Sequence, residues 1–119
     1  MTLGRACLLV YILLFAFGGS VHLFHILQGG WLPYTYVPDW INAYWTSLAL
    51  FDFVAIILLL RWRRAGLVAS LLIMVSDVAV NTYAHNLTGG NIYWGYLGQV
   101  MFLGFIIGTF GFLWRGEKS

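Results

Sequence analysis

The sequence predicts an all-α, polytopic membrane protein: a four-transmembrane-helix bundle with both termini cytoplasmic. Hydrophobic residues make up 61% of the 119 residues and charged residues only 8%, which leaves too little polar surface for a water-soluble domain. Four apolar runs, each of about the 20 residues that span a bilayer, take up nearly the whole length. We therefore expect residues 1–119 to form a single membrane domain, with no room for a soluble catalytic module.

The basic residues predict the orientation. All six lie before the first apolar run, between the second and third, or after the fourth: Arg5, Arg61, Arg63, Arg64, Arg115 and Lys118. Basic residues concentrate on the cytoplasmic side of membrane proteins, so both termini and the turn at 61–64 are expected there. The size and charge pattern resemble those of many small bacterial inner-membrane proteins. We therefore expect the protein to lie in a bacterial inner membrane. Such a basic fringe favours anionic headgroups and gives no indication of nucleic-acid binding.

The first helix is predicted over about 6–27, before the sequence Gln28-Gly29-Gly30. Its start also resembles a signal peptide, but a retained span completes the charge pattern. Pro33 and Pro38 mark a non-helical external loop. The sequence Pro38-Asp39 is a start signal for the second helix, predicted over about 40–60.

After a tight turn at 61–64, the third helix is predicted over about 66–85 and the fourth over about 92–114, with Thr88-Gly89-Gly90 between them. Tyr and Trp residues are frequent near the predicted external ends of all four helices. An interfacial belt accounts for most of them. The excess on this side also fits an aromatic vestibule over a pocket that opens between helices.

Two aspartates lie within the apolar runs at a similar depth. At a rise of 1.5 Å per residue, Asp52 lies about 13 Å inward from Arg61, and Asp77 about 15 Å inward from Leu67. A carboxylate at the bilayer centre costs roughly 2.5–3.5 kcal/mol on insertion scales, so both need partners. We expect them to face one another across the bundle.

Helical periodicity brings further polar residues to the same region. His22 and His25 share one face of the first helix, and Asn81 lies on the face of Asp77. A bundle with these faces turned inward would hold a polar pocket in its outer half, which includes Gln99 of the fourth helix. The predicted proton-handling, catalytic residues are His22, Asp77 and Asp52, and the predicted ligand-binding residues are His25, Asn81, Gln99 and Trp45. Of the two aspartates, we expect Asp77 to matter more, because it shares its stripe with Asn81.

Two alternatives compete with a functional pocket. The aspartates would act as helix fasteners if they only accept hydrogen bonds from neighbouring side chains. His22, His25 and His85 could also bind zinc or, across helices, a haem. With three histidines and no cysteine at their depth, we expect no metal and no other cofactor.

A face of small residues lies on the fourth helix, at Gly104, Gly108 and Gly111. Such a face brings helices into close contact. It is explained equally by packing inside the bundle and by contact with a second copy or a larger membrane complex.

A family resemblance covers most of the chain. The segment 20–23, Ser-Val-His-Leu, followed by Gly30-Trp31, resembles the His-Leu and Gly-Trp elements on an early helix of the emopamil-binding sterol isomerases of the EXPERA superfamily. Later helices of that superfamily are similar in order to three elements of this sequence: the apolar helix ending at Arg61, the segment 76–78, Ser-Asp-Val, and Tyr83 after it.

The resemblance implies a bundle whose intramembrane cavity accepts sterols or amphipathic amines, with His22 in the proton-handling position. Family members carry membrane-embedded glutamates near that histidine. The one glutamate here is Glu117 in the tail, so Asp52 and Asp77 would take their place.

Together these patterns predict an integral membrane protein whose polar cavity binds a lipophilic or amphipathic ligand, such as a membrane lipid, a sterol-like molecule or an amine. Acid/base, isomerase-like chemistry would suit its residues, and whether the protein is an enzyme stays open. The alternative is a non-catalytic accessory subunit of a larger membrane complex. The direction in which the two aspartates point distinguishes the two.

Overall fold

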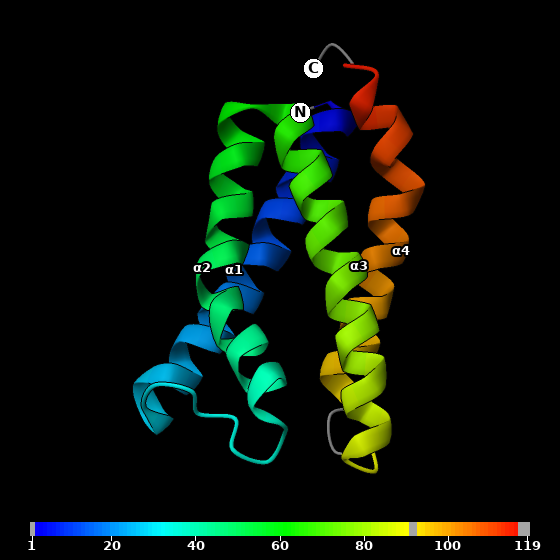
Figure 1. Ribbon diagram of the computed structural model, residues 1–119. Helices are drawn as coiled ribbons and strands as arrows, with labels where there is room; N and C mark the ends of the chain where they lie inside the picture. The colour runs from blue at the N-terminus through cyan, green and yellow to red at the C-terminus, as the bar shows by residue number, and fades with distance from the viewer. Residues whose placement is uncertain (1, 91–92, 117–119) are drawn as a thin grey trace.

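Four long helices form the protein, as a computed structural model that describes residues 2–90 and 93–116 shows. They are α1 (Leu3–Gly29), α2 (Asp39–Arg61), α3 (Arg63–Leu87) and α4 (Tyr93–Trp114). All four are long and apolar enough to cross a membrane. They run side by side along one direction, and α1 begins at the same end of the bundle at which α4 ends (Figure 1). The predicted all-helical class, with four helices long and apolar enough to cross a membrane, is therefore confirmed.

The helices are somewhat longer than the sequence predicted, since each of α1, α2 and α3 extends past its predicted range at both ends. The predicted start of the fourth helix, Ile92, lies outside the described residues. The expected turn at 61–64 is reduced to Trp62, because Arg61 ends α2 and Arg63 begins α3. Gly66 allows this sharp reversal: a Cβ atom there would lie 2.5 Å from the backbone nitrogen of Leu59.

The arginines gather at one end of the bundle. They belong to the start of α1, the junction of α2 and α3, and the residue that follows α4: Arg5, Arg61, Arg63, Arg64 and Arg115. Lys118 lies outside the described residues. We call this the arginine end, and the opposite end, where the α1–α2 and α3–α4 connections lie, the loop end.

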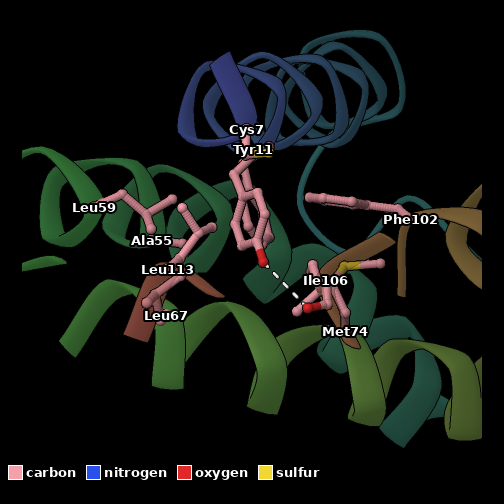
Figure 2. Packing of buried hydrophobic residues seen from close by; sticks show 10 residues of the cluster. Cys7, Tyr11, Ala55, Leu59, Leu67, Met74, Phe102, Ile106 and Leu113 are labelled. Atoms are coloured by element: carbon pink, nitrogen blue, oxygen red, sulfur yellow. Dashed lines mark hydrogen bonds between the residues drawn. The ribbon is translucent and has the colours of Figure 1, made fainter. Parts of the chain in front are cut away.

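Tyr11 lies within the hydrophobic core of the arginine-end half. Its side chain is fully buried, and its hydroxyl donates to the backbone oxygen of Ile106 at 3.3 Å and lies 2.8 Å from Oγ1 of Thr109. Figure 2 shows the ring surrounded by apolar side chains of the other three helices. This contact fastens α1 to α4.

The glycine face of α4 points away from the bundle. Gly104, Gly108 and Gly111 are exposed, and a Cβ atom at any of them would meet nothing within 4 Å. Packing within the bundle therefore does not explain these glycines.

Candidate ligand-binding cavity

A cavity of about 370 Å³ lies among the four helices in their loop-end halves. Phe15 and Phe102 close it toward the arginine end, with their ring centroids 5.1 Å apart. Most of its lining is apolar or aromatic, with a few polar groups among these side chains. The polar lining residues include every residue predicted for the site: His22, His25, Trp45, Asp52, Asp77, Asn81 and Gln99.

Asp52 contributes a buried carboxylate oxygen that has no partner among the described residues. The side chain is 4% exposed, and its Oδ1 atom accepts no hydrogen bond from any described residue. Nearly all buried polar atoms in proteins are hydrogen-bonded, because leaving one unpaired costs about 1–3 kcal/mol. An unpaired oxygen on a cavity wall therefore marks a place where a donor from outside the protein can bind.

Glycines of α1 make room for this carboxylate. A Cβ atom at Gly18 would lie 3.1 Å from Oδ2 of Asp52, and one at Gly19 would lie 3.2 Å from the Asp52 Cβ atom and 2.9 Å from the ring of Phe53. The two glycines let α1 approach α2 closely at this depth. They thereby bury Asp52 against backbone that offers it no donor.

Asp77 differs from Asp52 because the protein supplies it with a donor. It is 2% exposed, and its Oδ1 atom accepts a 2.5 Å hydrogen bond from the hydroxyl of Tyr44. The same hydroxyl lies 2.5 Å from Oγ of Ser76. Asp77 thus fastens α3 to α2 and also lines the cavity.

Three hydrogen-bonded polar side chains line the cavity on the loop-end side of Asp77. Nε1 of Trp45 donates to Oδ1 of Asn81 at 2.7 Å, and Nδ2 of Asn81 donates to Oε1 of Gln99. These bonds join α2, α3 and α4. They fix the orientation of the two amides at the side of the cavity.

Tyr34, in the α1–α2 connection, caps the cavity at the loop end. Its hydroxyl lies 2.8 Å from Nδ1 of His22 and 2.8 Å from Nδ1 of His25. Burial raises the pKa of Tyr34, so the hydroxyl keeps its proton at neutral pH. Because the hydroxyl has one proton, it can donate to only one of the two imidazoles, so at least one of the histidines donates to it through Nδ1–H.

The connection is held in place by Asn42 of α2. The Oδ1 atom of Asn42 accepts from the backbone nitrogen of Tyr34 at 3.0 Å, and its Nδ2 atom donates to the backbone oxygen of Leu32 at 2.9 Å. Leu32 adopts a φ of 54°, a left-handed conformation that a branched side chain rarely takes. The loop thereby bends so that Tyr34 is 5% exposed and faces both histidines.

The cavity opens sideways between α1 and α4. On the opposite side, α2 and α3 stay in contact to the loop end, where the rings of Trp40 and Tyr83 are 5.8 Å apart. The contacts of α1 with α4 lie nearer the arginine end, and Figure 1 shows α1 moving away from α4 toward the loop end. Phe17 of α1 and Trp94 of α4, which line this opening, are 70% and 80% exposed.

His85 lies apart from the cavity lining, with its ring stacked on Tyr96 at 5.1 Å. The histidine set considered for zinc or haem is therefore not assembled. Within residues 2–90 and 93–116, no three His, Cys, Asp or Glu residues are placed to hold a metal ion.

Sequence reasoning missed three residues that shape the site: Tyr34, Tyr44 and Gly18. Helical spacing gives a signal for Gly18, which lies four residues before His22 and therefore on the same face of α1. The position of Tyr44 next to Trp45 gives no such signal, because consecutive residues of a helix do not share a face. No periodicity exists for the loop residue Tyr34. Comparison with models of known protein families, with curated proteins and with solved structures gives no match.

Proposed function

We propose that the protein binds a lipophilic or amphipathic molecule with a donor group, an ammonium or a hydroxyl, in the cavity between its helices. The observation that carries this proposal is that Asp52 lines the cavity and that its buried Oδ1 atom has no partner among the described residues. A charged or hydroxyl donor would satisfy it, and a bond between ionised groups is about twice as strong as a neutral one. The aromatic and aliphatic lining would bury the rest of the ligand.

The side opening supports a ligand that arrives from the membrane. The loop end is capped by Tyr34, whereas the gap between α1 and α4 faces the surroundings of the bundle at the level of the apolar helix segments. A molecule dissolved in the bilayer would enter there with its polar head first. The volume of about 370 Å³ falls within the range of small-molecule pockets, and a tail could extend outward past Phe17.

Acid/base chemistry is the proposed activity if the ligand is also a substrate. An isomerisation of the sterol-isomerase kind adds a proton to one carbon of a double bond and removes a proton from the carbon next to the other, so the double bond moves by one position. The reaction needs no co-reactant. Asp52 and Asp77 would accept or donate a proton within the cavity. His22 would exchange protons with the exposed His25 through the hydroxyl of Tyr34, which lies 2.8 Å from Nδ1 of each histidine. This contact supports the proton-handling role that the EXPERA resemblance implies for His22.

We also propose that the arginine end is cytoplasmic, as the distribution of basic residues predicts. The cavity would then open toward the outer leaflet of what we infer to be a bacterial inner membrane. Cysteine labelling of intact cells tests this. Thr88→Cys at the loop end should react with an impermeant reagent, and a cysteine in place of Arg115 should not.

The binding proposal is tested with dodecylamine as the probe. A bound ligand stabilises the folded protein by RT ln(1 + [L]/Kd), so dodecylamine should raise the unfolding temperature of the purified protein in a neutral detergent. Asp52→Asn keeps the shape of the side chain and removes the charge, and it should abolish the shift. Asp39→Asn, at the exposed start of α2, is the matched control and should leave the shift unchanged.

Equal shifts in the wild type and in Asp52→Asn would contradict the proposal. The dependence on pH gives a second check, because protonation of the carboxylate removes the anion that the ammonium needs. The dodecylamine shift should therefore shrink as the pH falls. A shift for dodecanol that is lost in Asp52→Asn, with none for dodecylamine, would identify a hydroxyl ligand.

The second candidate function is that of an accessory subunit. The glycine face of α4 supports it, because these glycines are exposed and free of contacts within the described bundle. In lipid, such a face lets a second helix approach to backbone distance. A second copy or another membrane protein would bind there through Gly104, Gly108 and Gly111.

This alternative is tested by disulfide formation between copies. In a Cys7→Ser background, Gly108→Cys should form a disulfide-linked dimer in membranes if two copies meet at this face. Leu72→Cys, an exposed position on α3, is the control. Equal yields at the two positions would exclude a specific interface between copies.

A further inference from the structure

A second hollow lies on the outer surface of the bundle at the arginine end, away from the proposed ligand cavity. It is a groove of about 500 Å³ between α1 and α2. Its walls are aliphatic side chains of these two helices, and arginines of α1, α2 and α3 line its mouth. The lining residues are Arg5, Leu8, Leu9, Ile12, Leu59, Leu60, Arg61 and Arg63.

The arginines give the groove a positive mouth. Arg5, Arg61 and Arg63 come from three different helices and converge there because the α2–α3 reversal needs only Trp62. Guanidinium groups stay charged and bind phosphate oxygens in a fork geometry. The chemistry at this mouth therefore fits a phosphate group.

The walls of the groove are apolar along the direction of the helices. Leu9 is 42% exposed and Leu60 is 72% exposed, on helices long and apolar enough to cross a membrane. Ile12 lies one turn farther from the mouth than Leu8, so the aliphatic wall continues inward from the arginines. A hydrocarbon chain held at the mouth by its headgroup would lie against this wall.

We propose that this groove is a binding site for one anionic phospholipid of the leaflet at the arginine end. The phosphate binds among Arg5, Arg61 and Arg63, and one acyl chain lies along the aliphatic wall between α1 and α2. Basic pockets between transmembrane helices recognise anionic headgroups in this way, and each basic residue near the surface contributes about 1 kcal/mol. Arg64 is not part of the groove lining; it donates to the backbone oxygen of Trp114 at 3.1 Å and lies over the ring of Trp114.

The test is native mass spectrometry of the delipidated protein, titrated with phosphatidylglycerol or with phosphatidylcholine of the same acyl chains. The wild type should bind one phosphatidylglycerol more tightly than phosphatidylcholine. In the double variant Arg5→Gln/Arg63→Gln the affinity for phosphatidylglycerol should fall about 30-fold, as two contributions of about 1 kcal/mol give. Affinity for phosphatidylcholine, whose choline group offsets the charge of its phosphate, should fall by a smaller factor.

Two controls separate a built site from diffuse surface charge. Arg115→Gln removes a charge from the same end outside the groove and should keep the preference. Leu9→Trp keeps every charge but fills the groove, and it should weaken phosphatidylglycerol binding. The proposal is overturned if the wild type shows no preference, if the double variant keeps it, or if Arg115→Gln lowers the affinity as much as the double variant does. Unchanged binding by Leu9→Trp would overturn the acyl-chain part.

Discussion

Replacing the two buried aspartates by leucine should change the stability of the ligand-free protein by different amounts. Asp52 and Asp77 lie in the same cavity and are equally inaccessible, with 4% and 2% of their surface exposed. They differ in hydrogen bonding. Asp77 accepts from Tyr44 at 2.5 Å, whereas Oδ1 of Asp52 has no partner among the described residues.

The size of the difference follows from these contacts. A hydrogen bond to a charged group contributes about 1.5–3 kcal/mol, and an unpaired buried acceptor costs about 1–3 kcal/mol. Asp77→Leu loses the first contribution, and Asp52→Leu removes the second cost. Any repulsion between the two carboxylates is relieved in both variants alike. Asp52→Leu should therefore have the higher free energy of unfolding, by about 2 kcal/mol or more.

The measurement is reversible unfolding in mixed detergent micelles, with loss of helix content as the signal. Wild type, Asp52→Leu and Asp77→Leu are compared in the absence of any added ligand. If Asp52→Leu is destabilised as much as Asp77→Leu, Asp52 has partners within the fold. The assignment of Asp52 as a ligand-binding group would then be wrong.

Three further predictions follow from particular contacts. Gly66→Ala should lower the free energy of unfolding by about 2 kcal/mol or more, because the added Cβ atom would lie 2.5 Å from the nitrogen of Leu59. The control is Gly104→Ala, whose added Cβ atom would meet nothing within 4 Å. Equal stabilities of the two variants in the same micelle assay would refute the reasoning. Tyr34→Phe removes the hydroxyl shared by two histidines, so it should destabilise the protein by about 1 kcal/mol. It should also speed amide hydrogen exchange in the α1–α2 connection. Unchanged exchange would show that the hydroxyl does not hold this connection in place. Gly18→Leu should abolish the dodecylamine shift in unfolding temperature, because its side chain would occupy the space beside Oδ2 of Asp52; a full shift would place the probe elsewhere.

The gathering of His22, Asp52, Asp77 and Asn81 around one cavity could be predicted because it depends on helix geometry. A fixed rise and turn per residue set the depth of each side chain and the face it shares. The burial of apolar stripes then turns those faces toward one another. The same arithmetic grouped the glycines of α4 on one face, but it could not tell whether that face points inward or outward.

The cap over the cavity could not be predicted, because loop conformation has no period. Tyr34 reaches both histidines only because Leu32 takes a left-handed conformation and Asn42 binds the loop backbone. The role of Gly18 was also hidden. Helical spacing places Gly18 on the face of His22, but it does not show that the absence of a side chain there makes room for the carboxylate of Asp52.

The pairing of Asp77 with Tyr44 also could not be predicted from the sequence. Sequence periodicity predicts which residues share a helix face, but the partner of Asp77 is on another helix. Which of two buried carboxylates receives a donor depends on the rotation of α2 against α3. That rotation is a property of the packed bundle.

The central claim is that the carboxylate of Asp52 binds the polar head of a lipophilic ligand, and a contact between labelled atoms tests it most directly. Protein with 13C in the aspartate carboxyl groups is reconstituted in bilayers with 15N-dodecylamine, and the 13C–15N dipolar coupling is measured by solid-state NMR. An ammonium bound to a carboxylate lies about 2.7–2.9 Å from its oxygen, so we expect strong coupling in the wild type and in Asp77→Asn, and none in Asp52→Asn. Coupling that persists in Asp52→Asn, or that is missing from the wild type, would contradict the claim.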